Sequence, residues 1–165
     1  MLEIKSANSS NCLDGAKMDE QKLNNLLQAV PNYQGSFAVN ELDQVKIKYP
    51  TFLVVNLDDR NGKGTHWIGF AIYMKDVYIC DSLGGIKPDK KISAEWFYFL
   101  NLISTERNVI ITKQLSDSGL CGLFCVTFIK EMSRTNDFCD FITLFSSDLS
   151  TNDTVVKFLN KRKSI

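Results

Sequence analysis

The segment of residues 114–125 reads QLSDSGLCGLFC and decides how the rest of the chain is interpreted. From Cys121 onward, apolar residues recur at helical spacing: Cys121, Phe124, Cys125, Phe128 and Met132. A cysteine in the first turn of a helix lies near unpaired backbone N–H groups and the positive end of the helix dipole. Both stabilise a thiolate. The segment therefore predicts a helix that begins at Cys121 with a reactive thiol.

Segments on either side of this helix predict one domain over residues 1–165. The spacing of apolar residues predicts a helix over 19–30, which Pro31 ends, and a second helix that Ser93 caps. Two further helices are predicted over 137–145 and 153–161, the last with Asn152 as its cap. Short apolar or alternating runs predict strands at 45–49, 52–57, 66–74, 77–80 and 109–112. Lys75-Asp76 predicts a hairpin between the third and fourth of these. The class expected is α+β, with a mostly antiparallel central sheet flanked by helices.

Three other polar residues lie where they could act with Cys121. His66, the only histidine, begins a predicted strand, and Asp81 ends the next one. Side chains of paired strands lie within ~5.5 Å, so the carboxylate could orient the imidazole. Gln114 stands seven residues before Cys121, and its amide could join the Cys121 backbone N–H in stabilising an oxyanion. Thiol, base, acid and amide donor are the parts of a cysteine hydrolase.

Each of these residues also has a simpler interpretation when it is taken alone. Cys121 would be a buried structural cysteine, and His66 a surface residue at a strand edge. Asp81 would form a turn with Ser-Leu-Gly, and Gln114 would be an ordinary loop residue. Cys125, one turn after Cys121 on the same helical face, is expected to belong to the core.

Three neighbours of the proposed catalytic residues are candidates for contact with a substrate. Trp67 follows the histidine directly. Gly119 permits a tight approach before the cysteine, and Gly122 would keep side-chain bulk away from a bound backbone.

Composition excludes several other classes of protein. The chain has 165 residues, a formal net charge of zero and 44% hydrophobic residues. Five scattered cysteines and no signal-peptide pattern predict a soluble protein of a reducing compartment. A single histidine and no CxxC pair argue against a zinc site, so no metal or cofactor is expected. The small basic clusters at 87–91 and 161–163 are interpreted as solvated ends and not as nucleic-acid grooves, since binding dominated by phosphates needs several clustered cations.

The ordered set of His66, Asp81, Gln114 and Cys121 resembles the adenovirus maturation protease family. Its clan also holds proteases of other DNA viruses, virophages and Maverick-type elements, and the cellular ubiquitin-like-protein proteases. The similar stretches, within residues 26–132, are VPNYQGSF at 30–37, His66-Trp67, YICDSLG at 78–84, the Gln114–Cys121 spacing and CGLFC at 121–125.

The resemblance implies a monomeric viral cysteine endopeptidase that processes capsid or scaffold precursors at Gly-Gly or Gly-X sites. It would act in the host cytoplasm or nucleus, at the virus factory, and in the virion. The alternatives are a deconjugating protease for a ubiquitin-like modifier and an inactive relative that only binds a partner.

Departures from the adenoviral pattern change the expectations about activation. The adenoviral acid is a glutamate, whereas Asp81 matches the cellular branch. The adenoviral enzyme is basic and DNA-stimulated, and its activating peptide forms a disulfide with a cysteine on the strand before the glutamine. This chain is neutral, and residues 108–112 hold no cysteine. We therefore expect activation by neither DNA nor a peptide.

Overall fold

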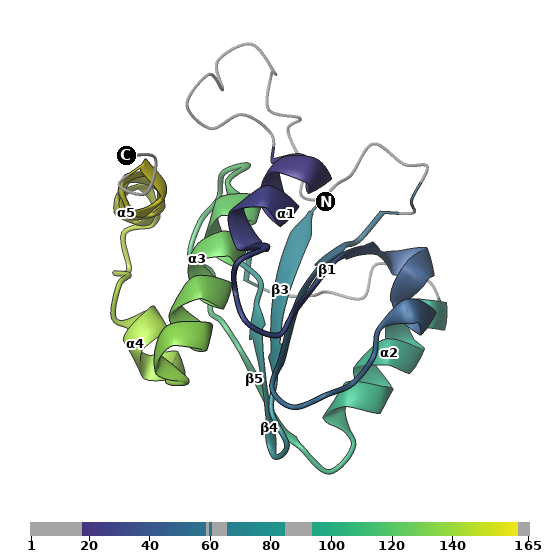
Figure 1. Cartoon of the computed structure of the whole chain (residues 1–165). Helices are drawn as coiled ribbons and strands as arrows, with labels where there is room; N and C mark the ends of the chain where they lie inside the picture. The colour runs from purple at the N-terminus through teal and green to yellow at the C-terminus, as the bar shows by residue number, and fades with distance from the viewer. Residues whose placement is uncertain (1–17, 59, 61–65, 85–93, 162–165) are drawn as a thin grey trace, which may run out of the picture.

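The computed structural model of the chain describes residues 18–58, 60, 66–84 and 94–161. Five strands form one sheet in the order β1-β2-β3-β4-β5, with helices on both faces (Figure 1). The elements are α1 (Glu20–Leu27), β1 (Tyr33–Ala38), the 3₁₀ helix η1 (Val39–Gln44), β2 (Thr51–Asn56), β3 (Trp67–Ile72), β4 (Asp76–Cys80), α2 (Ala94–Ser104), β5 (Asn108–Ile111), α3 (Cys121–Thr135), α4 (Phe138–Ile142) and α5 (Leu149–Lys161).

The α+β class is confirmed, but the sheet is mixed and matches the expected antiparallel arrangement only loosely. The three central strands β2, β3 and β4 pair antiparallel, and each edge strand pairs in parallel with its neighbour. Parallel neighbours need a crossover connection. The segment with η1 supplies it between β1 and β2, and the segment with α2 supplies it between β4 and β5.

Side chains on the two faces of the sheet belong to two separate hydrophobic cores. In β2, Phe52 and Val54 pack with α1 and α3, while Leu53 and Val55 face η1 and α2. All six residues of this strand are buried, because helices cover both faces of the sheet (Figure 1).

Helix α3 lies close against β3 because that strand presents small residues to it. A Cβ added at Gly69 would lie 2.9 Å from the ring of Phe128 and 3.6 Å from Sγ of Cys125. The next residue on that face is Ala71, which is fully buried in the same core. This close packing places the first turn of α3 beside the start of β3, where Trp67 and His66 lie.

Most predicted elements are present, and two predictions are wrong. Residues 45–49 form no strand; the backbone N–H of Lys46 instead donates to the side chain of Gln34 at 3.0 Å, and its carbonyl accepts from the same amide. Asn152 is no helix cap, because α5 begins at Leu149 and Asp148 accepts the N–H of Ser150 at 3.1 Å.

A few predictions concern residues that the structure does not describe. The Ser93 cap and the basic cluster at 87–91 lie outside the described residues, as do Cys12 and the last two residues of the cluster at 161–163. Among the described helices, none is long and apolar enough to span a bilayer.

Candidate active site

The hairpin of β3 and β4 brings the histidine and the aspartate together. His66 immediately precedes β3 and Asp81 immediately follows β4, so antiparallel pairing sets them side by side. Nε2 of His66 lies 2.7 Å from Oδ1 of Asp81, and their side chains are 11% and 2% exposed. A hydrogen bond between such sheltered groups fixes the orientation of the ring.

Asp81 is itself held rigidly by the neighbouring strand end. Oγ1 of Thr112 accepts its backbone N–H at 2.9 Å and donates to its carbonyl at 3.0 Å. Oδ1 also accepts the N–H of Leu83 at 3.2 Å, and the carbonyl accepts the N–H of Gly84 at 3.0 Å. Asp81 therefore both forms the turn with residues 82–84 and bonds to His66, so the two interpretations of this residue are compatible.

Cys121 is the first residue of α3, as its sequence position predicts. The backbone N–H of Trp67 donates to its Sγ at 3.5 Å. The thiol therefore faces the start of β3, next to His66. Cys121 remains partly exposed, whereas Gly122 and residues 124–129 of the helix are buried.

The two titrating groups shift each other toward an ion pair. Burial raises the pKa of the Cys121 thiol, but His66 and the N–H groups of Trp67 and Gly122 outweigh it, so the pKa falls below its usual value. Burial lowers the pKa of His66, but the hydrogen bond to Asp81 and the interaction with Cys121 raise it to about 9. Both shifts act in the direction of a thiolate beside an imidazolium.

The second ring nitrogen of His66 is available for the thiol. Nδ1 is buried and has no hydrogen-bond partner among the described residues, because Nε2 is the atom that faces Asp81. Cys121 raises the pKa of the imidazole, but among the described residues no hydrogen bond joins its Sγ to Nδ1. Contacts of this kind are often long in the absence of substrate.

Gln114 lies in the connection between β5 and α3, and its side chain is exposed. Its amide Nε2 donates to the carbonyl of Ser116 at 3.2 Å. Gly84, with φ of +72°, packs so closely on it that a Cβ would lie 2.4 Å from Cβ of Gln114. The loop that contains Asp81 thus packs against the loop that contains Gln114. The contact of the Gln114 amide with an oxyanion stays a prediction.

The three candidate substrate neighbours have different surroundings. Nε1 of Trp67 donates to the carbonyl of Met18 at 2.8 Å. Gly122 is buried beneath Met18, whose Cβ would lie 2.4 Å from an added Cβ, so packing alone demands glycine there. Gly119 is exposed with open space around its Cα. Contact of any of the three with a substrate remains a prediction.

Cys125 belongs to the core, as expected, at 1% exposure. Burial and the neighbouring Cys80 thiol raise its pKa. Within the described part of the chain, no cluster of three or more histidine, cysteine or acidic residues could hold a metal ion.

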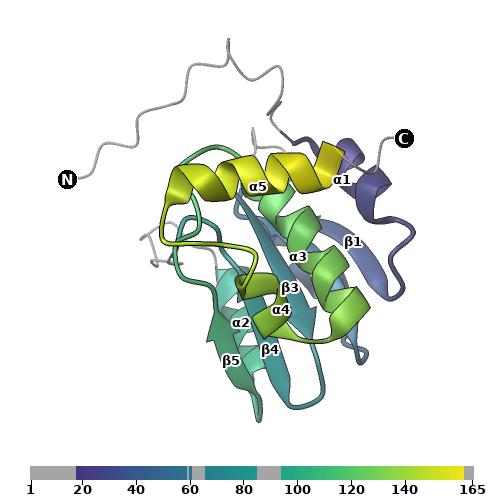
Figure 2. The same cartoon turned by 90° about the vertical axis from the view of Figure 1, so that its left-hand side faces the viewer.

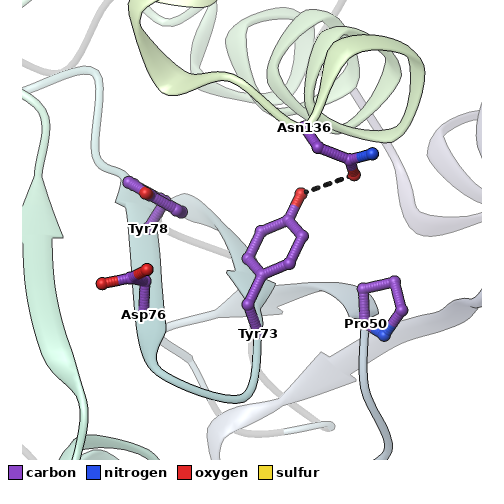
Figure 3. Close-up of a pocket in the computed structure, with 5 residues that line it drawn as sticks. All are labelled: Pro50, Tyr73, Asp76, Tyr78 and Asn136. Atoms are coloured by element: carbon purple, nitrogen blue, oxygen red, sulfur yellow. Dashed lines mark hydrogen bonds between the residues drawn. The ribbon is translucent and has the colours of Figure 1, made fainter.

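A cavity of about 330 Å³ opens at the far end of the sheet. It is lined by Pro50, Tyr73, Asp76, Tyr78 and Asn136 (Figure 3). These residues lie around the β3–β4 turn and the C-terminal end of α3, whereas His66, Asp81 and Cys121 lie at the opposite ends of the same elements. The cavity is therefore not part of the cysteine site.

Neither a protein-family model nor a curated protein matches this chain.

Two residues that shape the site were not predicted from the sequence. Thr112 stands at the end of a predicted strand, but its bonds to Asp81 depend on the parallel pairing of β4 and β5. Met18 contributes a backbone carbonyl, for which side-chain chemistry gives no signal.

Proposed function

We propose that the chain is a cysteine endopeptidase with Cys121 as nucleophile, His66 as acid and base, and Asp81 as the group that orients His66. The observation that carries the proposal is the arrangement at the start of β3. Nε2 of His66 is bound to Asp81, and the Cys121 thiol lies beside the same ring with the N–H of Trp67 on its sulfur.

The reaction follows from the charge state of the pair. The Cys121 thiolate attacks the scissile carbonyl carbon and forms a tetrahedral oxyanion. Its collapse breaks the C–N bond as His66 gives its proton to the departing amine, which leaves a thioester. The neutral imidazole then takes a proton from water, and the resulting hydroxide displaces the thiolate and releases the acid.

The oxyanion needs donors close to Cys121. We propose the Cys121 backbone N–H, unpaired at a helix start, and the amide of Gln114. In the structure this amide donates to Ser116, so it would exchange that bond for the oxyanion when substrate binds.

The substrate class rests on the resemblance of the sequence to adenovirus-type maturation proteases. We propose capsid or scaffold precursors cut at Gly-Gly or Gly-X sites, in infected cells or in particles, by a monomeric enzyme. Removal of a ubiquitin-like modifier is the second candidate, supported by Asp81 in place of glutamate.

The direct test uses a fluorogenic peptide that ends in Gly-Gly before the leaving group. The purified chain should release the fluorophore, and the Cys121→Ala chain should not; equal rates would refute the proposal. A panel of ubiquitin-like fusions then separates the two candidates, since efficient cleavage of one fusion would favour deconjugation. Mass spectrometry of capsid proteins from particles with active or inactive enzyme would identify the precursors.

The proposal includes no nucleic-acid or peptide activator. Because the net charge is zero, duplex DNA at ~0.15 M salt should change the rate of the purified chain by less than about tenfold. Larger stimulation would show that a local basic patch outweighs the neutral total.

A further inference from the structure

The segment that leads into Cys121 is held from two sides. We call residues 114–120 the cysteine loop. On one side, the carbonyl of Ser82 accepts the N–H groups of Leu115 and Ser116, both at 2.9 Å. Ser82 follows Asp81 directly, so these bonds fix the loop relative to the aspartate.

On the other side lies α5, which crosses the N-terminal end of α3 (Figure 2). Nδ2 of Asn152 donates to the carbonyl of Leu115 at 3.0 Å and to that of Ser146 at 2.9 Å, while its Oδ1 accepts the N–H of Ser146 at 2.8 Å. Asn152 is fully buried. A buried amide with both ends bonded has one orientation, so it fixes the position of the Leu115 carbonyl.

The next residue of α5 extends this contact toward Cys121. Oδ1 of Asp153 accepts from Oγ of Ser116 at 2.6 Å. A hydroxyl has one hydrogen, so Oγ of Ser116 must accept from its other two partners, the N–H of Ser118 at 3.0 Å and Oγ of Ser118 at 2.8 Å. A chain of hydrogen bonds thus runs from α5 to Ser118, three residues before the nucleophile.

We propose that Asn152 and Asp153 are positioning residues, which hold the cysteine loop so that the Gln114 amide and the Cys121 N–H meet the same oxyanion. This inference rests on the proposed function. Donors must lie about 2.7–3.1 Å from the developing charge, and a misplacement of ~1 Å can cost ~100-fold in rate. Helix α5 would then serve the oxyanion site without touching substrate.

The experiment replaces Asp153, because it is only partly buried and its loss leaves the α5 core contacts in place. The variants are Asp153→Ala and Asp153→Asn, of which the second keeps an oxygen acceptor. The matched control is Asn160→Ala: its amide joins the same helix to Oγ1 of Thr127 at 3.0 Å, two turns away from the cysteine loop.

Two readouts separate oxyanion geometry from thiol reactivity. One is kcat on the Gly-Gly fluorogenic peptide. The other is the alkylation rate of Cys121 by iodoacetamide, followed by mass spectrometry of its peptide, because alkylation forms no oxyanion. Asp153→Ala should lower kcat about 10-fold, with KM and alkylation within about twofold of the unmodified chain. Asp153→Asn should recover at least half of the lost rate, and Asn160→Ala should keep full kcat.

Three results would overturn the inference. They are an unchanged kcat for Asp153→Ala, a parallel fall of kcat and alkylation, and an equal loss of kcat in Asn160→Ala. An Asp153→Asn variant as slow as Asp153→Ala would also exclude the Ser116 hydrogen bond as the cause. Failure of the proposed function would look different, since Cys121→Ala would then cleave the peptide as fast as the unmodified chain.

Discussion

The first and second turns of α3 each carry a cysteine, and the two thiols have opposite properties. The Cys121 thiol is partly exposed and its pKa is lowered, because His66 and backbone N–H groups outweigh its burial. The Cys125 thiol is 1% exposed and its pKa is raised, by burial first and by Cys80 second. Both residues face β3, so what differs is the part of the strand that each one meets.

The difference shows that a reactive thiol depends on where the helix starts relative to the sheet. Cys121 lies at the start of β3, where the N–H of Trp67 donates to its sulfur and the imidazole of His66 lowers its pKa. Cys125 lies over Gly69, whose partner on β4 is Cys80, so burial and a second thiol dominate its surroundings. Four residues along one helix thus separate a thiol whose pKa is lowered from one whose pKa is raised.

The strongest test of this comparison replaces each cysteine in turn. Cys121→Ala should reduce peptide hydrolysis to background while the chain still folds. Cys125→Ala should keep kcat within a few-fold and lower the free energy of unfolding by about 1 kcal/mol, as a small core truncation does. Rates on the fluorogenic peptide and thermal melts measure the two effects. Residual hydrolysis by Cys121→Ala would remove it as nucleophile.

Replacing the groups that lower the Cys121 pKa should have the next largest effect. His66→Ala should lower kcat nearly as far as Cys121→Ala, because one imidazole both forms the thiolate and protonates the leaving group. Asp81→Asn should cost less, since it orients the ring without transferring a proton. Steady-state kinetics of both variants check the order, and a larger loss for Asp81→Asn would contradict these roles.

Gln114→Ala tests the part of the site that the thiol pair does not supply. It should lower kcat by about 10²–10³ with little change in KM, because the amide would be used mainly in the transition state. Cys121 should still react normally with iodoacetamide in this variant. An effect confined to KM would assign Gln114 to ground-state binding of substrate.

The smallest expected effect is on alkylation at mildly acidic pH. The thiolate is the reactive form of cysteine, so the lowered pKa of Cys121 should make it react faster with iodoacetamide than the exposed Cys139 at pH ~6.5. Cys125 should not react in the folded chain. Equal labelling of Cys121 and Cys139 would contradict the difference in thiol reactivity.

The rate of peptide hydrolysis should fall as the pH rises through about 9, where His66 loses the proton needed by the leaving group.

The sequence by itself determined the elements whose signal is local. The α3 periodicity, the apolar run of β2 and the Lys75-Asp76 hairpin are set by side-chain spacing and turn chemistry, and each is present. The hairpin also accounts for the pairing of His66 with Asp81, since antiparallel strands bring the start of one beside the end of the other. The first-turn position of Cys121 follows from the same kind of signal.

Tertiary structure decided how segments that lie far apart in the sequence contact one another. Residues 45–49 alternate like a strand but find no partner strand, because Gln34 takes up the backbone groups of Lys46. The polar character of Asn152 marks it as a cap, yet it is buried inside α5, where its amide is bonded to Leu115 and Ser146. Alternation and polarity describe one segment at a time, whereas hydrogen bonds between distant segments depend on the packing of the whole chain.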